Sequence, residues 1–354
     1  MTTTTNKAKR KLRVIMLTDE RLLPKGNFED LSEKQRELRK TEFDIVAALQ
    51  ALGHEVWPIG VSNDVSAIRG AIDAYKPHIA FNLIEEFHGI GSFDQHVVSL
   101  LELMKQAYTG CNPRGLTLAR DKGLTKMILG YHGLAVPEFA TFPQRRKPQR
   151  PPKLTFPLIV KSLTEEGSAG ISSASIVNDY EKLAERVDFI HHATESTAIA
   201  EQFIEGREIY VGVMGNERTL VLPAWEMSMP DLPPDAPLIA SDRAKWDPAY
   251  QRQVGLSTGP AKLTKKLELH LARLSKQIYN LLGMSGYARL DYRVTPEGKA
   301  YLLEANPNPQ IARDEDFSMS AKHMGIEYEE LIQRILQCGM SYAETMRKQP
   351  RRQM

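Results

Sequence analysis

The chain has little cysteine, almost no excess charge and no long apolar run, and each absence excludes a class of protein. Its two cysteines, Cys111 and Cys338, are too few for a disulfide framework and lack the spacing of a zinc site. A formal net charge of +2 on 354 residues gives no indication of binding to nucleic acid or to a membrane surface. No uncharged segment approaches the roughly 18 residues that span a bilayer, and no signal-type apolar core follows the polar N-terminus. We therefore expect a cytoplasmic protein that binds neither nucleic acid nor membrane.

The first hundred residues alternate between predicted strands and predicted helices. Composition is that of an ordinary globular protein, with 42% hydrophobic and 25% charged residues, and the length allows two or three domains. Strands are expected at 12–18, 54–59 and 78–84, and helices at 34–52, 65–75 and 93–105. Such alternation predicts a parallel sheet and an α/β fold, in which ligands usually lie at the ends of strands. The segment 85–89 after the third strand, which contains His88, is therefore a candidate substrate loop, with a polar connection as the alternative.

The stretch from Gly286 to Asn306 predicts a β-hairpin around a Pro-Glu-Gly turn, because both arms are rich in aromatic and aliphatic residues. With Glu297 and Gly298 as a two-residue loop, antiparallel pairing sets Asp291 opposite Glu304, and residue 289 opposite 306. Side chains alternate along a strand, so these four polar groups share one face. The opposite face is apolar and is expected to be covered; it consists of Leu290, Tyr292, Leu303 and Ala305.

The polar face of this hairpin predicts a cation site. Two directly opposed carboxylates repel each other unless a cation lies between them. Carboxylate and amide oxygens suit Mg²⁺, so Asp291, Glu304 and Asn306 are the candidate metal ligands. Arg289 beside them would meet a phosphate or a developing oxyanion. The alternative is an ordinary exposed hairpin whose charges are solvated.

Weaker signals of nucleotide binding lie upstream of the hairpin. A predicted strand ends in Lys161 and runs into the small, glycine-containing loop 164–171, where backbone N–H groups could approach phosphate oxygens. Lys122 lies inside a helix predicted over 116–130, and Glu201 and Glu208 flank the connection between two further strands. Each signal has a plain alternative, which is an ordinary turn for the loop and charge on an exposed edge for the glutamates.

These segments occur in an order that is itself informative. They are Tyr108-Thr-Gly110, Asp121-Lys122, Phe156-Pro-Leu-Ile-Val-Lys161 with Glu166-Gly-Ser168, Glu201-Gln-Phe-Ile204 through Gly206-Arg-Glu208, Ser241-Asp-Arg-Ala-Lys245, Arg289-Leu-Asp291 and Glu304-Ala-Asn306. In this order they resemble the ATP-grasp enzymes, and most closely the D-alanine–D-alanine ligase branch. The resemblance covers roughly residues 81–336 and is strongest in the carboxyl-terminal half.

The resemblance implies a fold and a division into domains. An α/β domain with a parallel sheet, of the pre-ATP-grasp type, would precede a two-lobed ATP-grasp fold of α+β character. The expected divisions are a disordered lead at 1–11, the N-terminal domain at 12–112, a central lobe with a mobile phosphate loop at 113–204, a C-terminal lobe with the metal site at 205–340, and a basic tail at 341–354.

The resemblance also implies a role for each matching residue. Catalytic roles would fall to Arg289, at the transferring phosphoryl group, and to Lys245, on a lid loop. ATP would be held at its phosphates by Lys122, Lys161 and the loop residues Glu166, Gly167 and Ser168, at its adenine edge by the backbone around Glu201, Gln202, Phe203 and Ile204, and at its ribose hydroxyls by Glu208. Two Mg²⁺ ions, with Mn²⁺ as the alternative ion, would bind Asp291, Glu304 and Asn306. The substrates would meet His88, Asn308, Gln310 and Glu315. A homodimer is implied by the resemblance alone.

The implied reaction joins a carboxylate to an amine. The carboxylate attacks the γ-phosphate of ATP to give an acyl phosphate, and the amine then displaces phosphate to form an amide. The sequence leaves three rivals open: D-alanine–D-alanine ligase activity proper, a carboxylate kinase that releases the acyl phosphate, and an ATP-binding regulator without turnover. The intact set of Arg289, Asp291, Glu304 and Asn306 argues against the regulator.

Departures from the family pattern lead us to expect amino-acid-like substrates other than a pair of D-alanines. The family's N-terminal glycine-rich strand end with its substrate-binding glutamate is absent from residues 17–26. Pro-Asn-Pro-Gln310 follows residue 306, where the family has Thr-Ser-Pro-Gly. Glu315 stands where the family has a serine for the acceptor's carboxylate, and a glutamate would repel that carboxylate. The alternative is that Arg313 neutralises these acids and the alignment slips by a residue or two.

Overall fold

The computed structural model describes residues 11–146, 148–149, 154–165, 170–234 and 236–348, and the chain forms two compact units. One unit comprises residues 1–110 together with 327–354, and the other comprises residues 111–326. Residues 327–340 were expected in the carboxyl-terminal lobe but cluster with the N-terminal unit. The expected lead falls, except for Lys11, outside the described residues, and helix α11 continues through the first part of the expected tail.

The first unit is built on a parallel sheet in the order β2-β1-β3. Its strands are β1 (Arg13–Thr18), β2 (Glu55–Gly60) and β3 (Ile79–Asn82), and its helices are α1 (Glu33–Ala51), α2 (Ser66–Tyr75), α3 (Asp94–Leu103) and α11 (Tyr328–Lys348). The central strand β1 is buried over its last five residues, as expected for a strand covered on both faces. Ser32 and Gln35 form a capping box that begins α1. The predicted parallel sheet is confirmed.

Glu42 on α1 is a buried carboxyl beside the last residue of β1. Its Oε1 accepts a hydrogen bond from Thr18 Oγ1 at 3.0 Å, and its Oε2 has no hydrogen-bond partner among the described residues. Burial raises the pKa of this carboxyl from 4.5 to about 7. The folded protein therefore keeps Glu42 protonated in mildly acidic solution.

We expect Glu42 to make the stability of the protein depend on pH. Between pH 4.5 and about 7 the folded state holds a proton that the unfolded chain releases, so the free energy of unfolding should fall as the pH rises. The full contribution is about 3 kcal/mol. Glu42→Gln should remove this part of the pH dependence and be the more stable protein at pH 8. Chemical denaturation of both proteins at pH 5 and pH 8 measures the effect, and parallel pH dependences would contradict it.

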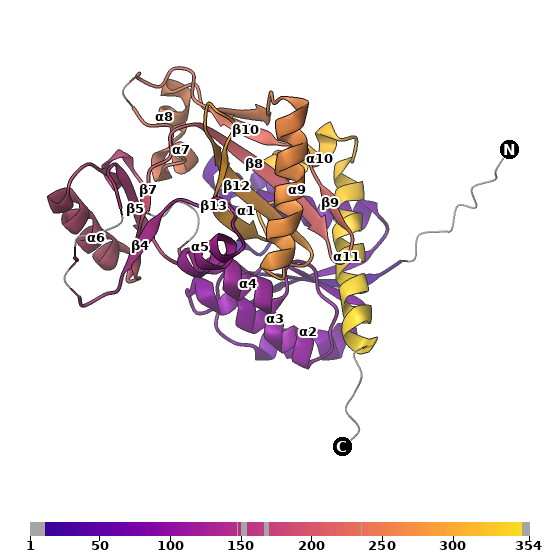
Figure 1. Ribbon diagram of the computed structural model, residues 1–354. Helices are drawn as coiled ribbons and strands as arrows, with labels where there is room; N and C mark the ends of the chain where they lie inside the picture. The colour runs from indigo at the N-terminus through magenta and orange to yellow at the C-terminus, as the bar shows by residue number, and fades with distance from the viewer. Residues whose placement is uncertain (1–10, 147, 150–153, 166–169, 235, 349–354) are drawn as a thin grey trace. The chain divides into compact units, whose positions relative to one another are not determined.

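The second unit contains two antiparallel sheets, of which the smaller has the order β4-β7-β5-β6. Its strands are β4 (Phe139–Phe142), β5 (Leu158–Ser162), β6 (Ile176–Val177) and β7 (Ala198–Gln202). Helix α6 (Tyr180–Thr194) covers this sheet (Figure 1). Leu183, Val187 and Ile190 are buried and recur at helical spacing, so one side of α6 supplies the core over β5.

The larger sheet has the order β11-β10-β8-β12-β13, with β9 paired to β8. Its strands are β8 (Arg207–Gly215), β9 (Thr219–Val221), β10 (Trp225–Ser228), β11 (Ser257–Pro260), β12 (Tyr287–Val294) and β13 (Ala300–Pro307). The accompanying helices are α4 (Pro113–Arg120), α5 (Lys122–Tyr131), α7 (Asp242–Trp246), α8 (Pro248–Gln253), α9 (Lys265–Leu281) and α10 (Asp316–His323). Helix α9 packs its apolar side on this sheet, as its pattern predicts (Figure 1). No helix in the described ranges is long and apolar enough to cross a bilayer.

The hairpin β12-β13 has the predicted polar pairs but a different turn. Asp291 pairs with Glu304, and Arg289 with Asn306, as expected. However, β12 ends at residue 294 and β13 begins at residue 300, so the connection is longer than two residues. The pairing register also shifts by one residue at Leu303. Tyr292 consequently opposes the buried residue 302, whereas the prediction put residue 303 in the apolar layer. A β-bulge at Leu303 offsets the longer turn and restores the predicted pairs.

The helix predicted over 116–130 is divided into α4 and α5 at Asp121. This residue is extended, with φ −81° and ψ 98°, and its side chain accepts a hydrogen bond from the Leu124 N–H at the start of α5. An N-cap of this kind begins a new helix rather than continuing the old one. Lys122 is therefore the first residue of α5 and not an interior helical residue.

Candidate active site

A buried glutamate, Glu201 on β7, lies between two buried lysines in the second unit. Its Oε1 is 3.0 Å from Lys126 Nζ and 3.1 Å from Lys161 Nζ. Burial would raise the pKa of this carboxyl, but the two lysines outweigh burial and lower it. Burial also opposes the charge on Lys161, yet Glu201 and Glu304 outweigh it and raise the lysine's pKa. Two cations thus surround one carboxylate, and the surplus of positive charge favours an anionic ligand.

Lys122 connects α5 to the metal-ligand candidate Glu304 on β13. Its Nζ lies 3.0 Å from Glu304 Oε1 and donates to the Glu165 carbonyl at 2.7 Å. Burial would raise the pKa of Glu304, but Lys122 and Lys161 outweigh it and bring the pKa to about 2. Glu304 is therefore a carboxylate throughout the neutral pH range.

Asp291 on β12 is held by the two other polar residues that the hairpin was predicted to carry. Arg289 binds it bidentately, with Nε 2.8 Å from Oδ1 and Nη2 2.9 Å from Oδ2, and Asn306 Nδ2 donates to Oδ2 at 2.9 Å. The Arg289 guanidinium lies over the ring of Tyr210, 4.6 Å from its centroid. Burial outweighs the guanidinium and raises the pKa of Asp291, and Glu304 adds to this effect. The predicted polar face is thus a connected network and not a set of separately solvated charges.

Lys245 of α7 lies near the charged groups of the same network. Its side chain is exposed, yet partial enclosure by the surrounding groups lowers the pKa of its ammonium, and the nearby charge of Arg289 lowers it further. Glu304 and Asp291 act in the opposite direction. This lysine therefore lies within electrostatic reach of the predicted metal ligands, but it belongs to a short helix and not to the predicted loop, and its part in a lid stays a prediction.

Glu208 is buried on β8, but its carboxylate already has two partners. Arg293 Nη2 donates to its Oε2 at 2.8 Å, and the Tyr210 hydroxyl donates to its Oε1 at 3.0 Å. Arg293 also donates to the carbonyls of Gly206 and Leu238, at 3.1 and 2.9 Å. A carboxylate can accept about four hydrogen bonds, so Glu208 retains the capacity to accept from ribose hydroxyls.

The segment predicted to read an adenine edge is only partly free to do so. Gln202 and Phe203 donate their backbone N–H groups to the carbonyls of Glu138 and Pro157, at 2.8 and 3.0 Å. The N–H of Ile204 has no hydrogen bond to another described residue and remains available as a donor. The predicted phosphate-loop residues Glu166, Gly167 and Ser168 lie outside the described residues.

The four predicted substrate residues are divided between the two units. His88 belongs to the first unit, where it is exposed and adopts a left-handed backbone with φ 57°. Asn308 has its side-chain oxygen committed to the Cys111 N–H at 2.8 Å, which favours a structural role over substrate binding. Gln310 is exposed, and Glu315 is the N-cap residue of α10. The predicted substrate contacts of these residues stay predictions.

The sequence analysis missed three members of the network: Lys126, Tyr210 and Arg293. Lys126 lies four residues after Lys122, a spacing that puts two side chains on one face of a helix. Arg293 lies two residues after Asp291, which puts it on the same face of a strand. These periodicities could have indicated both residues. Nothing in the local sequence marks Tyr210, whose place follows from the pairing of β8 with β12.

The donor set of the hairpin fits a hard divalent cation held together with phosphates. Asp291, Glu304 and Asn306 offer oxygen ligands, and each carboxylate is contacted here by a cation, Arg289 or Lys122. Such a set leaves coordination positions for phosphate oxygens and water, as is usual for Mg²⁺ with nucleotides. The part of the chain that the structure describes contains no cluster of three or more His, Cys, Asp or Glu side chains that could hold a metal ion by themselves.

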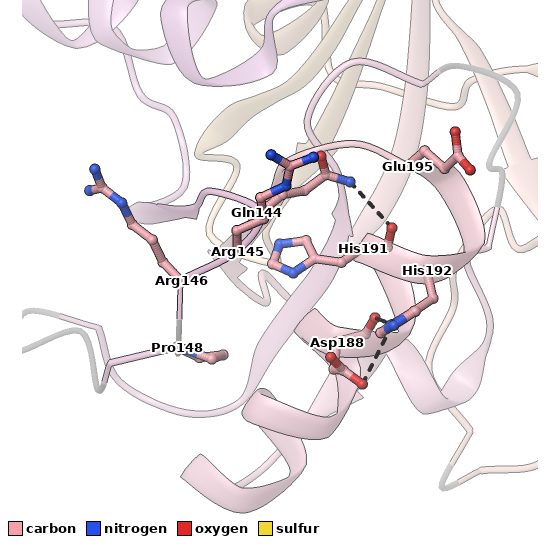
Figure 2. Close-up of a pocket in the computed structure, with 8 residues that line it drawn as sticks. All are labelled: Gln144, Arg145, Arg146, Pro148, Asp188, His191, His192 and Glu195. Carbon is pink, nitrogen blue, oxygen red and sulfur yellow. Dashed lines mark hydrogen bonds and ion pairs between the residues drawn. The ribbon is translucent and has the colours of Figure 1, made fainter.

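A separate cavity of about 730 Å³ lies between the basic segment after β4 and the end of α6 (Figure 2). Its lining residues are Gln144, Arg145, Arg146, Pro148, Asp188, His191, His192 and Glu195. Each imidazole contacts a carbonyl at 2.8 Å, that of Phe142 for His191 and that of residue 188 for His192. Among the lining residues that the structure describes, the two arginines are matched by the two acids. None of its lining residues belongs to the lysine and carboxylate network.

Comparison with known proteins adds an independent line of evidence. The family model described as D-ala D-ala ligase C-terminus matches residues 128–337. An uncharacterised protein of Sinorhizobium fredii is 30% identical over 82% of this chain and 85% of its own length. A D-alanine–D-alanine ligase of Aquifex aeolicus is 30% identical over 86% of this chain and 96% of its own. A D-alanine–D-alanine ligase from Bacillus anthracis, solved in complex with ATP, superposes with a TM-score of 0.73 at 22% identity, covering 94% of this chain and 99% of that one.

Proposed function

Because this chain belongs to the D-alanine–D-alanine ligase family of ATP-grasp carboxylate–amine ligases, we propose that it uses ATP to join two D-amino acids, D-alanine in the first instance. The observation that carries the proposal is the opposition of Asp291 and Glu304 within a group of buried cations. Such a site suits a magnesium-bound polyphosphate next to a carboxylate that is to be activated.

In this proposal the phosphates of ATP lie among Lys122, Lys161 and Arg289. The two lysines act as point charges. When ATP binds, the ion pairs of Lys122 with Glu304 and of Lys161 with Glu201 weaken, and each ammonium also contacts phosphate oxygens. Glu208 accepts from the ribose hydroxyls, and the free N–H of Ile204 donates to the adenine edge. Asp291, Glu304 and Asn306 hold Mg²⁺, which supplies neutralisation of the phosphate charge. The number of ions and the use of Mn²⁺ stay predictions.

The proposed reaction has two steps. A carboxylate oxygen of the first amino acid forms a bond to the γ-phosphorus, while the bond from that phosphorus to ADP breaks and ADP leaves with the electron pair. The amine of the second amino acid, in its neutral form, then attacks the acyl carbon and expels inorganic phosphate, losing a proton as the amide forms. Arg289 is placed to stabilise charge on the transferring group and on the tetrahedral oxyanion. Lys245 closes the open side and helps to exclude water, which would hydrolyse the acyl phosphate.

The comparisons favour D-alanine as substrate over the different amine predicted from the sequence. The relative from Aquifex aeolicus, which is 30% identical over most of both chains, is named a D-alanine–D-alanine ligase. A second candidate remains, an acceptor that lacks a carboxylate or carries extra positive charge. It is favoured by the acids 314–316, since Asp316 is near enough to Arg289 to influence its pKa. A homodimer and a cytoplasmic location also stay predictions.

An assay of ADP release tests the proposal and separates its rivals. With Mg-ATP we expect turnover only when two amino acids, or two equivalents of D-alanine, are present. Turnover with a carboxylate that carries no amine, and with no amine added, would favour the kinase, and nucleotide binding without any turnover on a broad panel would favour the regulator. Preference for a diamine or an amidated acceptor over D-alanine would contradict the main proposal and select the second candidate. Asp291→Asn serves as the inactive control.

A further inference from the structure

Lys126 on α5 is a fully buried lysine that the proposed reaction does not use. Its side chain is 1% exposed, and its pKa is lowered to about 8, chiefly by burial. Besides its ion pair with Glu201, its Nζ donates a hydrogen bond to the carbonyl of Leu303 at 2.8 Å. Burying an ammonium costs free energy, and the interactions that it makes with neighbouring groups have to offset this cost.

Leu303 is the bulge residue of β13, and the bulge decides which side chains face the site. On the turn side, Tyr292 pairs with residue 302, and on the other side Asp291 pairs with Glu304. Had the ladder continued without the bulge, Asp291 would oppose Leu303. A one-residue slip turns every following side chain to the opposite face of a sheet. Glu304 would then leave the face that carries Asp291, and the opposed carboxylates would be lost.

Two backbone groups at the bulge form hydrogen bonds outside the β12-β13 ladder. Their partners lie on α5 and on the segment that follows it. The Leu303 carbonyl accepts from Lys126, and the Leu302 N–H donates to the carbonyl of Ala135 at 3.0 Å. A buried backbone group without a partner is costly, so these two bonds stabilise the bulged register against the regular one.

We infer that Lys126 is a positioning residue for the metal site: by holding the bulge at Leu303 it keeps Glu304 opposite Asp291. This inference rests on the proposed function in one respect, namely that Asp291 and Glu304 bind the metal. The role acts through the backbone, because the ammonium contacts the Leu303 carbonyl and Glu201 and no metal-ligand side chain. Glu201 keeps its second partner, Lys161, when residue 126 is replaced.

The test compares Lys126→Met, which removes the donor and the charge, with Lys126→Gln, which keeps a neutral donor. Mn²⁺ binding in the presence of a non-hydrolysable ATP analogue is measured by electron paramagnetic resonance. We expect the methionine variant to bind Mn²⁺ about 10-fold to 100-fold more weakly, with the glutamine variant between it and the wild type. Amide hydrogen exchange of residues 300–307, without ligand, should be faster in the methionine variant. If that variant does not fold, the glutamine variant alone should still show both effects in smaller measure.

Tyr292→Phe is the matched control. Its hydroxyl forms a buried hydrogen bond of 2.9 Å with Ser275 on the apolar side of the same hairpin, so its loss destabilises β12 beside the bulge but leaves the bonds to Lys126 and Ala135 in place. Equal losses of Mn²⁺ affinity in the control and in Lys126→Met would overturn the inference, as would wild-type affinity and exchange in Lys126→Met. If the wild type itself binds neither nucleotide nor Mn²⁺, the proposed function fails, whereas hydrogen exchange at the bulge still tests Lys126.

Discussion

Glu304→Gln should lower the turnover number by about 10²- to 10³-fold while leaving the shape of the side chain unchanged. The pKa of Glu304 is about 2, so the wild type carries a full negative charge there at neutral pH, and the amide removes all of it. The magnesium site would lose one of its two opposed carboxylates, and Lys122 would lose the partner that lies 3.0 Å away. Initial rates of ADP release across a range of Mg²⁺ concentrations measure the effect.

The control for this prediction is Glu297→Gln. Glu297 lies in the turn of the same hairpin and is exposed, so this variant removes an equal charge at a distance from the network. We expect its turnover to match the wild type. Circular dichroism of Glu304→Gln establishes that the variant is folded. A folded Glu304→Gln protein with turnover within about threefold of the wild type would be incompatible with a metal-ligating role.

Glu201→Gln should destabilise the folded protein by about 3–5 kcal/mol, because it leaves two buried ammonium groups without their counter-charge. Lys126 and Lys161 both lie within 3.1 Å of the Glu201 carboxylate and are almost wholly buried. For a compact unit of this size, a loss of that order lowers the melting temperature by about 10 °C. Thermal unfolding and urea denaturation at pH 7 give the value.

The pH dependence of this variant provides a sharper test. The pKa of Lys126 is already lowered to about 8 with the carboxylate present, and loss of Glu201 should lower it further. A lysine whose folded pKa is below its unfolded value of 10.5 stabilises the folded state as the pH rises toward that value. The folded variant releases this proton at a lower pH than the folded wild type, so the deficit should shrink as the pH rises through 7 to about 8, where the wild-type lysine also loses its proton. A deficit that is constant over this range would contradict the assignment of the effect to unpaired lysines.

A variant of an exposed pair shows what burial contributes. Glu226 pairs with Arg207 at 2.6 Å, but both side chains are partly exposed. Glu226→Gln should therefore cost only about 0–1 kcal/mol. A loss in Glu226→Gln as large as that in Glu201→Gln would mean that the buried position of the lysines is not the cause.

Part of the candidate site could be predicted from local sequence patterns. Alternation along two strands was enough to put Arg289, Asp291, Glu304 and Asn306 on one face, and the pairing predicted for them is confirmed. The prediction reached this register through a two-residue turn that the structure does not contain. A longer turn and a bulge compensate each other, and neither can be recognised from apolar alternation alone.

The ion pairs at the site could not be predicted from local sequence patterns. The resemblance implied that the backbone around Glu201 reads an adenine edge, and no local pattern indicates that its side chain pairs with two lysines from α5 and β5. Which ammonium lies near which carboxylate depends on how sheets and helices pack, because such partners are far apart in the chain. Lys126 and Leu303, for example, are 177 residues apart.

The sequence by itself determined the alternating first unit, the antiparallel hairpin and the family to which the chain belongs, because periodicity and short motifs are local properties that survive in one dimension. The tertiary structure alone decided the bulge at Leu303, the partners of Glu208 and the pairing of buried charges around Glu201. The physical reason is that pairing of buried charges and the register of distant backbone groups are set by burial and close contact, and only the folded chain brings those groups together.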